Sequence, residues 1–255
     1  MIVRTKENFR QKRGTIVADK QLVNIYLMRH GMTMLNTSNS VQGWADSPLT
    51  PDGERASEYA GFGLKDVSFD AIYSSDSGRA MQTAQHVMSE NTATVNWSLT
   101  TEKGLRELCF GSFEGRSNDD LWEVLLAEAA EEEINEMDMP TFVDAMAHHE
   151  AQLRPPHANT WPSENYSMFT KRLSQSFYKI GAKALDNDHH NILVVSHGLS
   201  IQATLEALTD TPADFNNMAV NNSVTHLQFD GEQFHLARYN DTSYLETGRQ
   251  TFEES

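Results

Sequence analysis

Three short apolar runs are spread along the chain, at residues 23–28 (VNIYLM), 70–75 (DAIYSS) and 191–196 (NILVVS). Continuous runs of this kind are typical of strands that are buried on both faces of a parallel sheet. Between the first two lies TPDGERASEYAGFGL, where Thr50 suits an N-cap, Pro51 suits the first helical position, and small or apolar residues recur on one face. The pattern predicts a strand-helix-strand unit.

The remaining pattern predicts further elements of the same sheet. We expect helices over residues 77–89 and 163–185 and from Leu199, and a strand over residues 94–99. Residues 223–229 and 234–239 resemble strands, and the Asp230-Gly231 dipeptide between them is a strong hairpin signal. The order of elements predicts an α/β fold of three layers, α/β/α, with a mainly parallel sheet and an antiparallel edge strand.

The stretch from Asn118 to about His157 is rich in Asp and Glu. Apolar residues interleave with the acidic ones, at Leu121, Trp122, Leu125, Leu126 and Ile134. We therefore expect amphipathic helices inserted into the sheet fold over about residues 117–160, with a solvated acidic face over a small apolar core. The alternative is a lid that covers a substrate.

Length and charge limit the classes of protein. A chain of 255 residues suits one domain with an insertion, so we expect a single domain over residues 22–255 behind an N-terminal tail or edge segment at residues 1–21. The net charge of −16 argues against nucleic acid or an anionic membrane as a partner. No apolar run approaches the roughly 18 residues of a membrane span.

Cys109 is the only cysteine, which excludes an internal disulfide and any metal site built from several thiolates. A reducing compartment, the cytoplasm, is the expected location. The pairs His148-His149 and His189-His190 lack the spacing of a zinc-binding helix. We expect no metal and no cofactor.

Two histidines occupy equivalent places in the pattern. His30 and His197 each follow an apolar strand, and each is followed by glycine. Because ligands of open α/β sheets bind at the carboxyl ends of strands, both histidines are expected to face one crevice. Either one alone would more often be structural.

Two arginines strengthen the functional interpretation. Arg29 directly precedes His30, and Arg79 follows the strand at residues 70–75. Each alone suits a surface or salt-bridge role, but a guanidinium is permanently charged and its fork of donors matches phosphate oxygens. Together with the histidines, the arginines predict a pocket for a phosphoryl group.

Five ordered blocks of sequence carry a family resemblance. They are RHGMT at residues 29–33 with Asn36, QGWADSPLTPDG at 42–53, SSDSGRAMQTA at 74–84, LRELCFGSFEG at 105–115 and VVSHG at 194–198. From about Leu22 to Tyr239 the chain resembles the histidine phosphatase superfamily, also called phosphoglycerate mutase-like. Three positions depart from the commonest family pattern: Met32, Ser163 to Asn165, and Leu199.

The resemblance implies a role for each matching residue. His30 would be the nucleophile that becomes a phosphohistidine, and Glu107 the proton donor to the leaving oxygen. Glu114, Asp46 and Asp76 stay open as rivals of Glu107. The phosphoryl oxygens and their loop would be held by the remaining matched residues: Arg29, Arg79, His197, Thr33, Asn36, Gln42, Gly43 and Gly198.

These roles predict a phosphatase that hydrolyses a small phosphorylated metabolite without a metal ion. The alternatives are a phosphoglycerate mutase and a phosphate-binding module without activity. We favour the phosphatase because an acidic insertion would repel a carboxylate-bearing substrate. The edge strand at residues 234–239 could pair across a homodimer.

Overall fold

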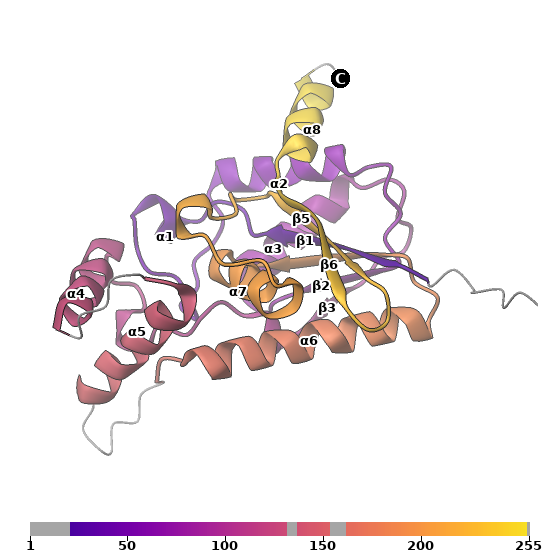
Figure 1. Cartoon of the computed structure of the whole chain (residues 1–255). Coiled ribbons are helices and arrows are strands. Elements are labelled where there is room, and N and C mark those ends of the chain that lie inside the picture. Colours follow the sequence, from indigo (N-terminus) through magenta and orange to yellow (C-terminus); the bar gives the residue numbers. More distant parts are fainter. Residues whose placement is uncertain (1–20, 132–136, 154–161, 254–255) are drawn as a thin grey trace, which may run out of the picture.

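A six-stranded mixed sheet forms the centre of the molecule in the computed structural model, which describes residues 21–131, 137–153 and 162–253 (Figure 1). The strand order is β3-β2-β4-β1-β5-β6; the first four strands pair parallel, whereas β5 pairs antiparallel with both β1 and β6. The strands are β1 (Val23–Arg29), β2 (Ala71–Ser74), β3 (Leu99–Thr101), β4 (Asn191–Ser196), β5 (Val224–Phe229) and β6 (Phe234–Asp241). The predicted α/β fold with a mainly parallel sheet is confirmed, and the edge strand β6 pairs antiparallel with its neighbour as expected.

Helices cover both faces of the sheet (Figure 1). Ile25 and Leu27 of β1 face a core shared with α6 (Tyr166–Asp186) and α7 (Gly198–Thr209). Met28 faces the opposite core, shared with α2 (Pro51–Gly63) and α3 (Gly78–Glu90), and α8 (Ser243–Glu253) packs on α2. The alternation of β1 side chains between two cores explains its nearly continuous apolar sequence.

The acidic insertion forms two helices beside the carboxyl edge of the sheet, α4 (Asn118–Glu131) and α5 (Met139–Leu153). Their apolar sides form a third core with the start of α6, while Asp119, Asp120 and Glu123 are exposed. The expected acidic face over an apolar core is confirmed. Residues 1–20 of the expected tail, and residues 132–136 and 154–160 of the expected insertion, lie outside the described residues.

The expected strand over residues 94–99 is wrong, because β3 begins only at Leu99. Asn96 has a left-handed backbone, with φ of 57°, which breaks an extended run, and the Val95 side chain is 76% exposed. The long helix α6 begins at Tyr166 instead of residue 163, because the Asn165 side chain accepts a hydrogen bond from the Met168 N–H and caps it.

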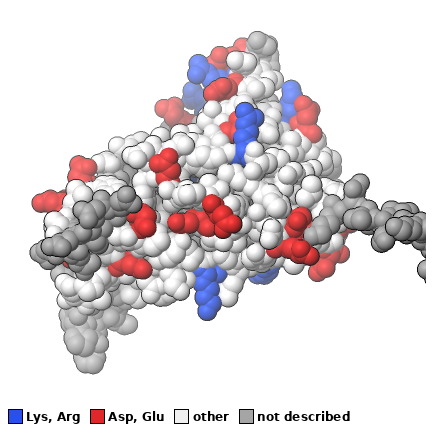
Figure 2. Space-filling model, in the orientation of Figure 1, with Lys and Arg blue, Asp and Glu red and all other residues white. Residues whose placement is uncertain are grey.

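Short elements connect the layers at the carboxyl edge of the sheet: α1 (Met34–Thr37) and the 3₁₀ turns η1 (Lys103–Leu105), η2 (Gly111–Phe113) and η3 (Phe215–Asn217). Within the described ranges, none of the helices combines the length and apolar character needed to cross a bilayer. Figure 2 shows Asp and Glu side chains spread over one face, with Lys and Arg mainly near its top and bottom. The strand β6 lies at the edge of the sheet. Pairing of this edge across a homodimer stays a prediction.

Candidate active site

His30 lies at the carboxyl end of β1 and is 3% exposed. Its Nδ1 lies 2.8 Å from the carbonyl oxygen of Gly31, and that contact requires the proton on Nδ1. Burial lowers the pKa of His30 well below its ordinary value, and the charges of Arg79 and Arg29 lower it further. His30 is therefore neutral near pH 7, with the lone pair of Nε2 free to attack phosphorus.

Hydrogen bonds from separate segments hold the backbone around His30. The Asn221 Nδ2 donates to the His30 carbonyl oxygen at 2.8 Å, and the His30 N–H donates to the Ser196 carbonyl oxygen at 2.9 Å. The Gly31 N–H donates to Thr83 Oγ1 at 2.9 Å. A Cβ at Gly31 would lie 2.8 Å from Ser57 Oγ, which explains the glycine. Sequence patterns gave no sign of Asn221 or Thr83 because both act on main-chain atoms far away along the chain.

His197 lies beside His30, with 5.2 Å between the ring centroids. Arg29 pairs with Ser196 in the parallel register of β1 and β4, so the residues that follow them, His30 and His197, lie at the same edge of the sheet. Ser75 Oγ accepts the Ser77 N–H and lies 2.7 Å from His197 Nε2. In the tautomer in which Ser75 donates to Nε2, the proton of His197 is on Nδ1, which is buried and has no partner among the described residues.

Burial lowers the pKa of His197 well below its ordinary value, with a further lowering by Arg79 and by His30. The ring is therefore neutral near pH 7, like that of His30. A neutral ring with its proton on Nδ1 has one donor that no described group accepts, although the ring itself is fully buried and lies outside the pocket lining.

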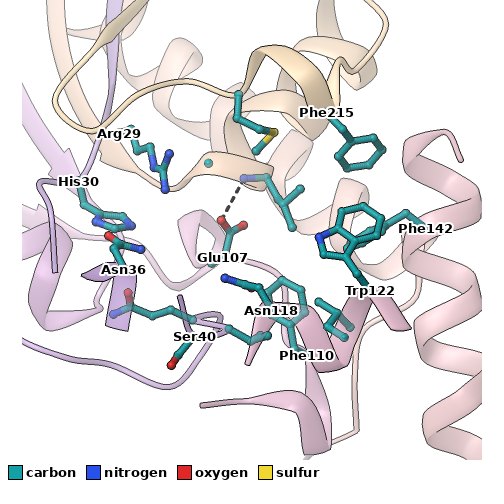
Figure 3. A pocket seen from close by; sticks show the side chains of 16 residues that line it. Arg29, His30, Asn36, Ser40, Glu107, Phe110, Asn118, Trp122, Phe142 and Phe215 are labelled. Carbon is teal, nitrogen blue, oxygen red and sulfur yellow. Dashed lines mark hydrogen bonds between the residues drawn. The ribbon is translucent and has the colours of Figure 1, made fainter. Parts of the chain in front are cut away.

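Arg29 opens onto the same space from the end of β1 (Figure 3). Its NH1 donates to the Ala219 carbonyl oxygen at 2.6 Å, and its buried Nε has no partner. Burial lowers the pKa of Arg29, but a guanidinium keeps its charge at neutral pH. One side of the guanidinium is thus anchored and the other is free to bind an anion.

Arg79 is fully buried behind the pocket wall, and its side chain is 0% exposed. It donates to the carbonyl oxygens of Gly43 at 2.8 Å and Ala45 at 3.0 Å and pairs with Asp46 at 2.9 Å, whereas its Nε has no partner. The structure therefore places Arg79 as a fixed positive charge near the histidines, and most of its donors already serve the loop at residues 42–46.

Glu107 follows η1 and lines the same pocket as His30. Its Oε2 accepts the Leu199 N–H at 3.0 Å, drawn as a dashed line in Figure 3, and its Oε1 accepts the N–H and the hydroxyl of Ser200 at 2.9 Å and 3.0 Å. These groups belong to the N-terminal turn of α7, where a carboxylate is favoured. The carboxyl group is held in one orientation beside the nucleophile.

Glu114 does not compete for the role of acid. Its carboxylate accepts four main-chain N–H groups at 2.7 to 3.0 Å, from Gly43, Trp44, Ala45 and Phe110. Glu107 also accepts main-chain N–H groups, so position and not hydrogen bonding separates the two carboxyl groups. Glu114 therefore fixes the loop at residues 42–46 and lies outside the pocket lining.

The two other rival carboxylates are engaged by arginines. Asp46 pairs with Arg79, and Asp76 forms a bidentate pair with Arg106 at 2.6 and 2.7 Å. This pair lowers the pKa of Asp76, chiefly through the hydrogen bond from Arg106. Among the described residues that line the pocket, Glu107 is the single carboxyl group.

The five smaller residues of the matched blocks divide into two groups. Asn36, Gln42 and Gly198 line the pocket. Thr33 and Gly43 lie behind it: Thr33 Oγ1 donates to Gln42 Oε1 at 2.7 Å, and the Gly43 N–H donates to Glu114. Thr33 also forms a capping box with Asn36 at the start of α1. Thr33 and Gly43 therefore bind neighbouring residues, Gln42 and Glu114, and do not line the pocket themselves.

The pocket is a cavity of about 340 Å³ with two unlike ends (Figure 3). Arg29, His30 and Glu107 form one end. The aromatic side chains of Trp122, Phe142 and Phe215 form the opposite end. Volumes of this order are usual for small-molecule sites. Within the described ranges, no cluster of three His, Cys, Asp or Glu side chains is arranged to hold a metal ion.

Arg172 on α6 is a further residue of the site that sequence reasoning missed. It forms a bidentate pair with Glu164 at 2.6 Å for each hydrogen bond. Its remaining donors bind the carbonyl oxygens of Gly104, Arg106 and Glu107. Arg172 therefore fixes the turn that carries Glu107. Its place inside an amphipathic helix gave no signal for this role.

The chain is similar in sequence and fold to known proteins. A crystal structure of phosphoglycerate mutase from Bacillus anthracis str. Sterne is 33% identical, with a TM-score of 0.81 over 91% of this chain and 98% of that one. The protein named probable phosphoglycerate mutase GpmB of Erwinia tasmaniensis is 27% identical over 76% of this chain and 78% of its own length. Its namesake in Salmonella choleraesuis is 36% identical over 40% of this chain and 46% of its own length, so the chain matches about half of that relative.

A match to a family model covers most of the described sheet and the site. The family model described as "Histidine phosphatase superfamily (branch 1)" matches residues 25–242, from β1 to the end of β6. The match includes His30, Arg79, Glu107 and His197. The chain belongs to the histidine phosphatase superfamily.

Proposed function

We propose that this protein is a phosphomonoester hydrolase that acts through a phosphohistidine on His30. One observation carries the proposal: the free Nε2 of a neutral His30 opens onto the same cavity as a guanidinium, Arg29, and a carboxyl group, Glu107. Phosphatases and mutases both occur in the superfamily. The cavity arrangement supplies the nucleophile, the charge and the acid that phosphoryl transfer needs.

In the first half-reaction, the Nε2 lone pair of His30 forms a bond to phosphorus while the bond from phosphorus to the ester oxygen breaks. Glu107 delivers its proton to that oxygen, so an alcohol leaves instead of an alkoxide. The negative charge on the phosphoryl oxygens is stabilised by Arg29 and by the Nδ1–H of His197, with Arg79 as a fixed charge behind them.

In the second half-reaction, a water molecule takes the place of the alcohol. The carboxylate of Glu107 accepts a proton from the water as the oxygen bonds to phosphorus, and the bond between phosphorus and Nε2 breaks. Inorganic phosphate leaves, and both His30 and Glu107 return to their initial states. We propose that no added metal ion is needed, since Arg29 and Arg79 supply the positive charge that Mg²⁺ supplies in other phosphoryl transferases.

The choice of hydrolase over mutase rests on the charges that line the cavity. A phosphoglycerate carries a carboxylate in addition to its phosphate, and such a group is usually held by Arg or Lys. Among the described lining residues, the charged side chains are Arg29 and Glu107, and Arg29 is the single cation. The exposed acidic residues of α4 are absent from the lining. The preference for a hydrolase therefore rests on the lack of a second cation in the lining, and not on repulsion between the acidic insertion and a substrate carboxylate.

A phosphoglycerate mutase is the second candidate, since the Bacillus anthracis structure and the two sequence relatives bear that name. A phosphate-binding module without activity is the third. It is disfavoured because His30, Glu107 and His197 are all present in hydrogen-bonded positions suited to chemistry.

The experiment measures phosphate release from p-nitrophenyl phosphate and a panel of alkyl phosphates, with and without EDTA, for the wild-type chain and His30→Asn. We expect release that EDTA does not change and that His30→Asn abolishes. Full activity of His30→Asn, or a requirement for added Mg²⁺, would contradict the mechanism. Conversion of 3-phosphoglycerate to 2-phosphoglycerate faster than phosphate release would establish the mutase instead, and no release from any ester would favour the binding module.

A further inference from the structure

The cavity end remote from His30 is formed by three aromatic rings from three different elements. Trp122 comes from α4, Phe142 from α5 and Phe215 from η3. The ring centroids lie 5.4 Å apart for Trp122 and Phe142, 5.2 Å for Phe142 and Phe215, and 6.5 Å for Trp122 and Phe215. We call these three residues the aromatic wall (Figure 3).

The aromatic wall is only partly covered by protein. Phe142 is 3% exposed, whereas Trp122 is 38% exposed although its ring contacts both neighbours. A large apolar side chain that is packed on one side and open to a cavity on the other is well suited to contact a ligand. The neighbouring lining residues Leu121, Leu199 and Met218 are apolar as well.

The spacing of the rings shows whether a cation has room between them. Rings that enclose an alkylammonium ion must leave a gap for the ion between them, because the cation lies over each ring face. The rings of the aromatic wall are in direct contact, at centroid distances typical of aromatic pairs. The carboxylate of Glu107 lies toward the other end of the cavity (Figure 3). The ring planes are inclined to one another by 50°, 89° and 47°, so the wall presents ring faces beside ring edges, which suits a neutral aromatic group in an edge-to-face contact.

We propose that the aromatic wall binds an aromatic ring in the alcohol part of the phosphate ester. This inference rests on the proposed function, which places the phosphoryl group at His30. A cavity of about 340 Å³ with its charged residues at one end accommodates a phosphate and one uncharged ring in line. Amide and hydroxyl side chains also line the cavity, at Asn36, Ser40, Gln42 and Asn118, and suit polar substituents of the substrate.

Phosphonates test this inference without any chemical step, because their bond from carbon to phosphorus is not hydrolysed by this mechanism. The dissociation constants of benzylphosphonate, cyclohexylmethylphosphonate and 3-phosphonopropionate are measured calorimetrically on the full chain. We expect benzylphosphonate to bind about 3- to 10-fold more tightly than the saturated ring, as expected for contacts between aromatic groups. The carboxylate-bearing compound should bind most weakly.

Equal binding of the two rings would overturn the inference, and so would tightest binding of 3-phosphonopropionate. Tighter binding of 3-(trimethylammonio)propylphosphonate than of benzylphosphonate would show a cage for a cation and overturn it as well. Since these measurements need no turnover, they stand apart from the test of the proposed function. That function fails if no ester is hydrolysed, whatever the phosphonates do.

Variants on α4 test whether the aromatic wall is the part of the cavity that binds the ring of the ligand. Trp122→Ala should weaken benzylphosphonate by about 10-fold and leave inorganic phosphate binding unchanged, whereas Trp122→Phe should retain most of the affinity. Leu126→Ala is the matched control, since Leu126 lies one turn further along α4, is 61% exposed and is absent from the pocket lining. Equal weakening of the benzyl and cyclohexylmethyl compounds by Trp122→Ala would overturn the aromatic preference. Unchanged phosphate binding shows that the variant is folded.

Discussion

The NH2 group of Arg172 donates a 2.7 Å hydrogen bond to the carbonyl oxygen of Glu107. Arg172 belongs to the 21-residue helix α6, which packs on the sheet, whereas Glu107 lies in a turn between short elements. The side chain of Glu107 is thus anchored by the start of α7 and its main chain by α6. The proposed acid is held from two sides by two long helices.

Replacing Arg172 by Met should lower the free energy of unfolding by about 3 to 5 kcal/mol, because it leaves the buried Glu164 carboxylate without its partner. Urea denaturation measures the change. Lys171→Met, at the exposed neighbouring position on α6, should stay near the wild-type value. A loss below 1 kcal/mol for Arg172→Met would contradict the anchoring role.

The lowered pKa of His30 predicts the acid side of the pH profile. The nucleophile must be neutral, and a lowered pKa keeps it neutral at pH values where an ordinary histidine is already protonated. Activity should therefore persist below pH 6.5 and fall only when His30 itself takes up a proton. NMR titration of the imidazole signals, with His30→Asn to assign the His30 signal, measures the pKa directly. A midpoint at or above 6.5 would contradict the effect of burial and of the two arginines.

Glu107→Gln should affect substrates according to their leaving groups. An alkyl alcohol leaves badly without a proton, so kcat for an alkyl phosphate should fall about 10²- to 10⁴-fold. p-Nitrophenolate leaves readily without protonation, so phosphorylation of His30 by p-nitrophenyl phosphate should fall much less, as single-turnover release of nitrophenolate would show. Glu123→Gln, on the exposed face of α4, is the control. Equal losses for both substrates would argue that Glu107 only maintains structure.

Ser75 and Ser74 form a matched pair for testing the tautomer of His197. Ser75 Oγ contacts His197 Nε2, whereas the equally buried Ser74 Oγ has no hydrogen-bond partner. Ser75→Ala should lower kcat/KM about 3- to 10-fold, the equivalent of one hydrogen bond of about 1 kcal/mol, and Ser74→Ala should change it little. The ¹⁵N shifts of His197 should report a loss of the Nδ1–H form in Ser75→Ala alone. Similar kinetics of the two variants would remove Ser75 from the site.

The sequence predicted the parts of the site that follow directly from strands. β1 and β4 were recognisable as apolar runs, and two parallel strands in register must place His30 and His197 side by side. Arg79 was recognisable in type and location, but its burial behind the loop at residues 42–46 depends on Asp46 and on carbonyl groups that no residue pattern reveals.

The parts that escaped prediction depend on contacts between distant segments. Helix α8 packs against α2 through Tyr59, Phe62 and Phe252, far apart along the chain. Asn221 acts on the backbone of His30 across 191 positions. The role of Trp122 at the cavity became visible only when α4, α5 and η3 were placed around it. A local pattern identifies elements, but these contacts follow from how the elements pack.

The loop at residues 42–46 lies between a carboxylate and a guanidinium, since its N–H groups point to Glu114 and its carbonyl oxygens to Arg79. The peptide between Gly43 and Trp44 is thus oriented by both charges at once. Ala45 takes part in these bonds through main-chain atoms alone, so its side chain can vary among relatives, whereas the Trp44 Nε1–H also donates to the Glu107 carbonyl oxygen at 3.0 Å and ties that side chain to the site. Glu114 and Arg79 should instead be retained or lost together, although 35 residues of sequence separate them.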